Sequence, residues 1–139
     1  MFLGEFRNRL DNKNRVAVPF QLRNELGNSV VVNRYLDGCL AIYTAEAWKV
    51  RYDSLMELPT NKADVRAYVR YMTSAAHQTG LDSQGRILIP DNLINSAGLN
   101  KDCVFIGAGD HVELWSAENW DKYNSTLTDA EIAAISENL

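Results

Sequence analysis

The sequence predicts an α+β fold in which two tandem copies of one small unit share a core, and two observations carry this prediction. First, LDNKNRVAVP at 10–19 recurs as LDSQGRILIP at 81–90, 71 positions later. Second, LAIYTAEAW at 40–48 recurs as VELWSAENW at 112–120, at an offset of 72. Two repeated segments in the same order indicate a tandem duplication of a unit of roughly 45 residues. A unit of that size is too small to bury a core alone, so each copy needs the other.

Strands are expected where apolar residues run or alternate between turn residues. They span 6–10, 15–18, 30–33 and 40–43 in the first copy, and 76–81, 86–89, 103–107 and 111–115 in the second. Helices are expected at 20–26, 45–57, 62–74, 117–123 and, as a short tail, within 128–139. Thr44, Ser116 and Thr128 are suitable N-caps for three of them. Asp37-Gly38 predicts a two-residue hairpin turn.

Several side chains are assigned to the interior. Val65, Tyr68, Val69 and Met72 form one apolar stripe at helical spacing and are expected to pack as core. The two cysteines, Cys39 and Cys103, lie in apolar strand-like runs without metal spacing and are expected to be buried, inert thiols.

Composition points to a soluble protein. The chain is 46% hydrophobic and 23% charged, which is ordinary for a globular domain. No apolar run approaches the roughly 18 residues of a membrane span, and the amino terminus lacks the apolar stretch of a signal peptide. We therefore expect a cytoplasmic protein without a membrane partner.

The repeated element reads strand, Asp-x-x-x-Arg, strand, Pro, which describes a tight β-hairpin. Asp11 and Asp82 are expected to structure it, because an aspartate accepts hydrogen bonds from turn amides. Asn14 and Gly85 occupy equivalent places and are residue types that adopt positive φ at least cost. The pattern alone leaves open whether the aspartate and arginine serve only to build the turn.

Charge separates the two copies. The net charge is −4, yet residues 1–23 carry +3, so the remainder carries −7. The first copy has cations where the second has none: Arg7, Arg9 and Lys13 stand against Gln78, Gly80 and Gln84. Nucleic-acid binding needs a local basic face rather than a basic total. Arg7 and Arg9 share one face of a strand, and Lys13 and Arg15 extend that edge into the hairpin tip. This asymmetry favours the first hairpin as the main DNA reader, with arginine bridging guanine O6 and N7.

These residues also carry a family resemblance. The start MFLGEF, the paired LDxxxR hairpins, LDGCLAIY and VELWSAENW resemble the MraZ proteins of bacteria, which belong to the SpoVT/AbrB-like superfamily of swapped-hairpin transcription factors. The resemblance covers residues 1–123 and implies two repeats interlocked as an intramolecular pseudo-dimeric β-barrel with flanking helices. The implied divisions are repeat 1 at 5–48, connecting helices at 49–75, repeat 2 at 76–120 and a helical tail at 121–139.

The same resemblance implies a function. It predicts a transcriptional regulator, expected to be a repressor, that binds direct repeats in double-stranded DNA upstream of the division and cell wall gene cluster. It also predicts a ring-shaped homo-oligomer, an octamer or larger, associated with the nucleoid and needing neither cofactor nor metal. The implicated DNA contact maps to Arg15 and, through the second motif, to Arg86. Two departures are the Asn14 that stands where a glycine is common, and the missing cations of the second copy.

Two other classes of protein compete with this interpretation. An enzyme is disfavoured, because His77 and His111 are the only histidines and neither has a clustered Ser or Cys partner. A ring-forming protein-interaction scaffold without specific DNA binding is the stronger alternative, with the 65–72 stripe and the tail helix as candidate contact surfaces. An antitoxin-like role is less favoured, because two full copies leave only a short tail.

Overall fold

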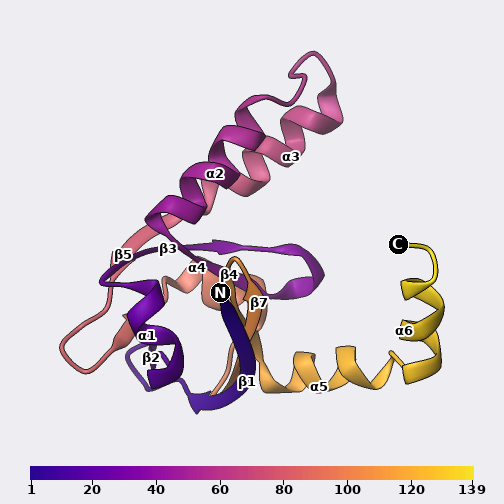
Figure 1. Ribbon diagram of the computed structural model, residues 1–139. Helices are drawn as coiled ribbons and strands as arrows, with labels where there is room; N and C mark the ends of the chain where they lie inside the picture. Colours follow the sequence, from indigo (N-terminus) through magenta and orange to yellow (C-terminus); the bar gives the residue numbers. More distant parts are fainter.

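The computed structural model describes all 139 residues. Its strands, six α-helices and one 3₁₀ turn follow one another along the chain as drawn in Figure 1. In order they are β1 (Phe2–Arg9), β2 (Arg15–Ala17), α1 (Phe20–Leu26), β3 (Ser29–Arg34), η1 (Leu36–Gly38), β4 (Leu40–Thr44), α2 (Ala45–Met56), α3 (Ala63–Ser74), β5 (His77–Gly80), β6 (Arg86–Leu88), α4 (Asp91–Ala97), β7 (Asp102–Gly109), β8 (Val112–Ser116), α5 (Ala117–Ser125) and α6 (Asp129–Ser136).

The two copies exchange their outer strands. Six strands form one antiparallel sheet in the order β1-β7-β8-β4-β3-β5. β1 of the first copy pairs with β7 of the second, from Phe2 opposite Gly109 to Arg9 opposite Asp102. β5 of the second copy pairs in turn with β3 of the first, and β4 pairs with β8 at the centre. Neither copy therefore completes its own part of the sheet, as the size of the repeat predicted.

The third pairing between the copies is a small ribbon. β2 and β6 form a separate two-stranded antiparallel sheet in which Val16 lies opposite Ile87. Both of these side chains are fully buried and join a core cluster of 19 buried residues to which both copies contribute. The ribbon is therefore attached to the core by one face and free on the other.

The barrel that the resemblance implied is not closed. The six-stranded sheet ends at β1 on one side and β5 on the other, and the β2–β6 ribbon is a sheet of its own. The physical reason lies in the two Asp-x-x-x-Arg turns: at each, the chain leaves the large sheet, and its next strand pairs with its counterpart in the other copy. Back toward its own hairpin, β2 forms only a single bridge, between Val16 and Leu10. The observed architecture is an α+β fold with an open antiparallel sheet.

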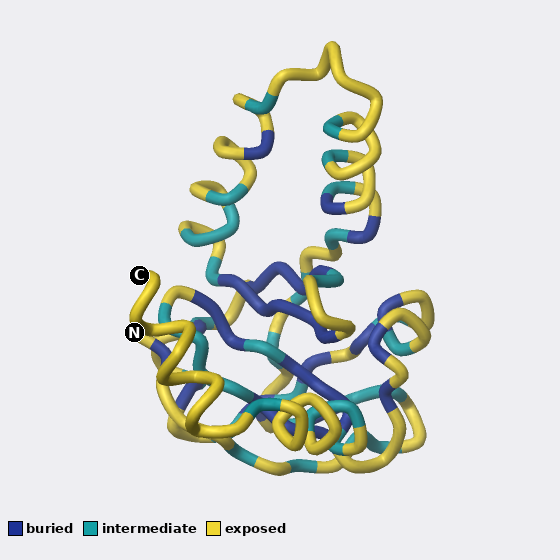
Figure 2. Tube along the Cα trace, turned by 90° about the vertical axis from the view of Figure 1, so that its right-hand side faces the viewer, coloured by how far each residue is buried: buried dark blue, intermediate teal, exposed yellow.

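Two helical extensions leave the body. α2 and α3 project away from the sheet as a helical hairpin, and α5 and α6 form an arm on another side (Figure 1). Buried residues concentrate in the body, while most of the helical hairpin is exposed (Figure 2). The predicted core stripe on α3 is therefore confirmed only at Met72, which is fully buried, while Val65 and Val69 are half-buried. Tyr68 is 38% exposed, because α3 rests on the body only at its carboxyl end.

Most predicted elements are confirmed within one to four residues, and the caps are where the sequence placed them. The side chains of Thr44, Ser116 and Thr128 each accept a hydrogen bond from a backbone amide three residues on. The Asp37-Gly38 turn is present with both residues at positive φ, but it lies within a five-residue connection between β3 and β4 rather than forming a two-residue loop. α4 was not predicted, although it is the repeat of α1.

The cysteines are buried, as predicted. Cys39 is 2% exposed, Cys103 is 1% exposed, and neither forms a disulfide. Burial raises the pKa of both thiols, that of Cys103 to about 11, so neither thiol is a ready nucleophile. None of the helices combines the length and apolar character that a membrane crossing requires.

Candidate nucleic-acid interface

The first Asp-x-x-x-Arg turn is organised by its aspartate. Oδ1 of Asp11 accepts hydrogen bonds from the backbone amides of Lys13 and Arg15, both at 2.9 Å. Oδ2 accepts a third from Nε of Arg15 at 2.8 Å. The backbone amide of Arg15 is the main cause that lowers the pKa of the Asp11 carboxyl, with the Lys13 amide and the Arg15 guanidinium adding to it. The carboxylate thus fixes the turn and the arginine together.

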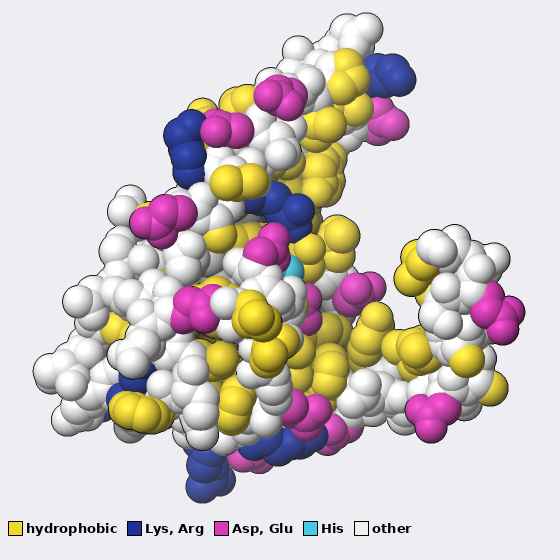
Figure 3. Space-filling model, in the orientation of Figure 1, with side chains coloured by type: hydrophobic (Ala, Val, Ile, Leu, Met, Phe, Trp, Pro, Cys, Tyr) yellow, Lys and Arg dark blue, Asp and Glu magenta, His cyan; other side chains and the backbone are white.

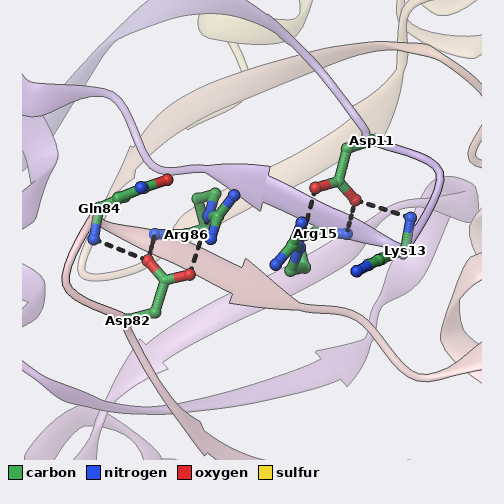
Figure 4. A network of polar contacts seen from close by, with 6 residues as sticks. All are labelled: Asp11, Lys13, Arg15, Asp82, Gln84 and Arg86. Carbon is green, nitrogen blue, oxygen red and sulfur yellow. Dashed lines mark hydrogen bonds and ion pairs between the residues drawn. The ribbon is translucent and has the colours of Figure 1, made fainter.

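The second turn repeats this arrangement, as Figure 4 shows. Asp82 accepts from the amides of Gln84 and Arg86 at 2.9 Å and from Nε of Arg86 at 2.8 Å. The Arg86 amide is again the main cause that lowers the pKa of this carboxyl. The contacts of the two aspartates are therefore the same in the two copies.

The turn residues also connect the copies. Asn14 has φ 58° and Gly85 has φ 73°, so both equivalent positions lie in the left-handed region. The carbonyl oxygen of Asn14 accepts from the amide of Ile89, and that of Gly85 accepts from the amide of Val18, both at 2.8 Å. Each hairpin tip is therefore held by the strand that leaves the other hairpin, which makes the ribbon a single unit.

Both motif arginines lie on the outer face of this ribbon. Their neighbours Val16 and Ile87 point into the core, so alternation along a strand turns Arg15 and Arg86 outward. Their side chains are 30% and 27% exposed. Nε of each is used by its aspartate, while the terminal Nη groups make no hydrogen bond within the chain. Two oriented guanidinium groups with free outer edges result.

The other predicted cations lie differently. Arg7 and Arg9 share the exposed face of β1, as predicted, but carboxylates partner both. Arg7 is bound to Asp121 of α5 at 2.8 Å, and Arg9 lies 3.5 Å from Asp102 of β7. Lys13 is exposed and has no ion-pair partner. The predicted cationic edge is thus neutralised along β1 and free at the hairpin tip.

Sequence reasoning missed Arg23. Nε of this α1 residue donates a hydrogen bond to the carbonyl oxygen of Val18 at 2.7 Å. Its guanidinium carbon lies 2.3 Å from the position that a Cβ atom at Gly85 would occupy. The first copy thus supplies a cation to the tip of the second hairpin. At the other tip, Asn14 donates to the carboxylate of Asp91 at 2.8 Å. The one available signal was that the repeat of Arg23 is not a cation, since Ile94 stands there.

The two histidines lie outside this surface. His77 is exposed in β5. His111 is 7% exposed, with Nδ1 at 2.7 Å from Asp110 and Nε2 at 3.5 Å from Glu113. Burial alone would lower the pKa of His111, but the neighbouring carboxylates of Glu113 and Asp110 outweigh it and raise the pKa. No group of three or more His, Cys, Asp or Glu side chains is arranged to hold a metal ion.

Comparison with known proteins gives consistent matches over nearly the whole chain. The family model described as "MraZ protein, putative antitoxin-like" matches twice, at residues 1–71 and 72–139. A protein of Clostridium tetani named "Transcriptional regulator MraZ" is 44% identical over 131 residues, which is 94% of this chain and 92% of that protein. Proteins with the same name from Clostridium beijerinckii and Alkaliphilus metalliredigens are 46% and 43% identical, covering 96% and 100% of this chain and 94% and 99% of those proteins.

Proposed function

The chain belongs to the MraZ family, and from that premise we propose that it is a DNA-binding transcriptional regulator, not an enzyme, that reads DNA with the β2–β6 ribbon. The observation that carries this proposal is the pair of guanidinium groups, Arg15 and Arg86, held on one outer face by identical aspartate contacts. A two-stranded antiparallel ribbon fits the major groove. The free Nη edges of the arginines suit the O6 and N7 acceptors of guanine.

Cations around the ribbon support phosphate contact. Lys13 lies at the first hairpin tip without an ion-pair partner, and Arg23 lies against the second tip. Arg7 and Arg9 can join them only by exchanging a carboxylate for a phosphate, an exchange that exposed ion pairs allow at small cost. Because the whole chain carries −4, binding depends on this local surface and weakens steeply with salt.

The exchange of β1 and β5 between the copies supports the swapped-hairpin organisation of the SpoVT/AbrB-like superfamily. We therefore propose that residues 5–48 and 76–120 act as two interlocked repeats of one DNA-binding unit, with the helices of 49–75 and the tail of 121–139 as appendages. The aspartate contact that holds Arg86 matches the one that holds Arg15. We therefore propose Arg86 as a contact of equal standing, in place of the expectation that the first hairpin is the main DNA reader.

We propose that the two helical extensions, α2–α3 and α5–α6, assemble copies of the chain into a ring. Exposed hydrophobic side chains gather on the α2–α3 hairpin and on the C-terminal arm (Figure 3). Met56 is 46% exposed, and Ile132 and Ile135 of α6 are 48% and 51% exposed. A helix of only eight residues is marginal in water without a packing partner. Contact between the arm of one copy and the helical hairpin of the next would cover both surfaces, and a repeated contact of this kind closes a ring.

A ring also accounts for affinity. Several ribbons facing several direct repeats gain avidity on the order of 10²-fold or more without new contacts. Light scattering during size-exclusion chromatography tests assembly: the variants Met56→Asp and Ile135→Asp should each form smaller particles than the wild type. A wild-type chain that elutes as a monomer at micromolar concentration would contradict the ring.

The proposed target is a set of direct repeats upstream of the division and cell wall gene cluster, bound in the cytoplasm at the nucleoid, with repression as the outcome. Fluorescence anisotropy with the DNA upstream of the gene tests it, with Arg15→Ala as the variant and circular dichroism as the fold control. Loss of binding in a folded variant supports the proposal. Equal affinity of variant and wild type, or a flat salt dependence, would favour the alternative of a protein-interaction scaffold.

A further inference from the structure

The outer face of the ribbon is symmetric in its arginines but not in their neighbours. In the register of β2 and β6, Leu88 lies directly opposite Arg15, and Ala17 lies directly opposite Arg86. Ala17 and Leu88 are equivalent positions of the two copies, 71 residues apart. One half of the ribbon thus presents arginine beside a large aliphatic side chain, and the other presents arginine beside a methyl group.

Leu88 is exposed in a strand whose adjacent side chains are not. It is 53% exposed, whereas Ile87 and Ile89 on either side are fully buried. A single exposed leucine is ordinary on a protein surface, so exposure by itself indicates nothing. Its position does, because side chains directly opposite each other on an antiparallel ribbon have Cβ atoms about 5 Å apart. Whatever Arg15 touches therefore lies within reach of Leu88.

Resting on the proposed function, we propose that Leu88 is a specificity-determining residue that packs on the 5-methyl group of a thymine in the major groove. Aliphatic contact with this methyl group is how apolar side chains distinguish thymine from cytosine. The expected place of the thymine is within one or two base pairs of the guanine bound by Arg15, because base pairs stack about 3.4 Å apart. Arg86 lies on the diagonal from Arg15, about 7–8 Å away, which is roughly two base-pair steps.

This contact gives the binding site a direction. A ribbon with two-fold symmetry presents the same side chains to both strands and favours a palindrome. Leu88 opposite Arg15, against Ala17 opposite Arg86, makes the two halves of the ribbon prefer different bases. The cations around the tips differ in the same way, with Lys13 at one and Arg23 at the other. A ribbon of this kind selects a directional unit, and directional units arranged on a ring suit direct repeats.

Removal of the thymine methyl tests the contact. Duplexes carrying one repeat are prepared with deoxyuridine replacing each thymine in turn, and anisotropy gives Kd for the wild type, for Leu88→Ala and for the control Leu3→Ala. Leu3 is also an exposed leucine, 64% exposed, but lies on β1. The wild type and the control should each lose about fourfold at one thymine, the factor for one buried methyl group. Leu88→Ala should bind both duplexes alike.

Equal wild-type binding to every thymine and deoxyuridine pair would overturn the inference while leaving the proposed function standing, because the same titrations measure DNA binding. So would a Leu88→Ala variant that keeps the full discrimination. Absence of saturable binding to any duplex would remove the proposed function and the inference together.

Direction is tested by cleavage. An iron chelate attached through Gln84→Cys at the second hairpin tip should cut DNA on one side of a single repeat, and the buried Cys39 and Cys103 leave this site as the only accessible thiol. In that background, Ala17→Leu would place a leucine opposite Arg86, as Leu88 lies opposite Arg15. This change should raise cleavage on the opposite side. Equal cleavage on both sides without the Ala17→Leu change would overturn the directional reading.

Discussion

Substitution of either motif arginine should weaken specific DNA binding by the same factor. Arg15 and Arg86 have Nε bound to an aspartate at 2.8 Å in both copies and similar exposures of 30% and 27%. Each presents two free Nη groups, the number needed for one bidentate contact to guanine. Such a pair contributes about 1–3 kcal/mol, so Arg15→Ala and Arg86→Ala should each raise Kd about 5- to 150-fold.

The assay is anisotropy on a duplex with one repeat, so that ring avidity does not multiply the loss. The fold should survive, because Asp11 and Asp82 each keep two backbone hydrogen bonds after their arginine is removed. Replacing either arginine by lysine keeps the positive charge but loses the planar pair of donors, and should therefore recover non-specific DNA binding only. A loss in Arg15→Ala with none in Arg86→Ala would refute the single-unit ribbon and return the reading role to the first hairpin alone.

Three further outcomes test the fold and its titratable groups. Gly107→Ala should lower the free energy of unfolding in urea by about 1–3 kcal/mol or more. The reason is that the new Cβ atom would lie 2.3 Å from the backbone of Leu3 on β1. An unchanged urea midpoint would contradict the β1–β7 register. The raised pKa of His111 stabilises the fold below about pH 6.5, so the melting temperature should fall as pH rises through that pKa, and His111→Gln should flatten the profile. The lowered pKa values of Asp11 and Asp82 stabilise the hairpins above about pH 4 and that contribution should be lost as pH falls further; carboxyl ¹³C shifts that titrate at ordinary values would disprove the contacts.

Much of the fold was predictable because the repeat aligns two readings of each element. The strands, the caps and the two Asp-x-x-x-Arg hairpins follow from local pattern and turn chemistry and formed where those rules placed them. The Asp37-Gly38 turn formed too, but within a longer connection than the two-residue loop expected. α4 was missed although α1, its repeat, was predicted, because Asp91–Ala97 is short and polar and only comparison with the first copy identifies it. The α3 stripe was misassigned because periodicity shows that a helix has an apolar face but not what covers that face.

The site was predictable only where it is local. The Asp11 contacts span four residues and follow from the spacing of the motif. The partners of Arg7 and the place of Arg23 join residues distant in the chain or from different copies, so charge counting found the cations but not what they face. The position of Leu88 opposite Arg15 likewise depends on the β2–β6 register, which the sequence of one strand does not give.

We propose that Arg15 and Arg86 read guanines from one ribbon in the major groove. Replacing single guanines of the repeat by 7-deazaguanine, which removes the N7 acceptor, tests it most directly. Two guanines about two base-pair steps apart should be sensitive to this replacement. One of them should become insensitive in Arg15→Ala and the other in Arg86→Ala. Sensitivity at no guanine, or sensitivity that both variants keep unchanged, would contradict it.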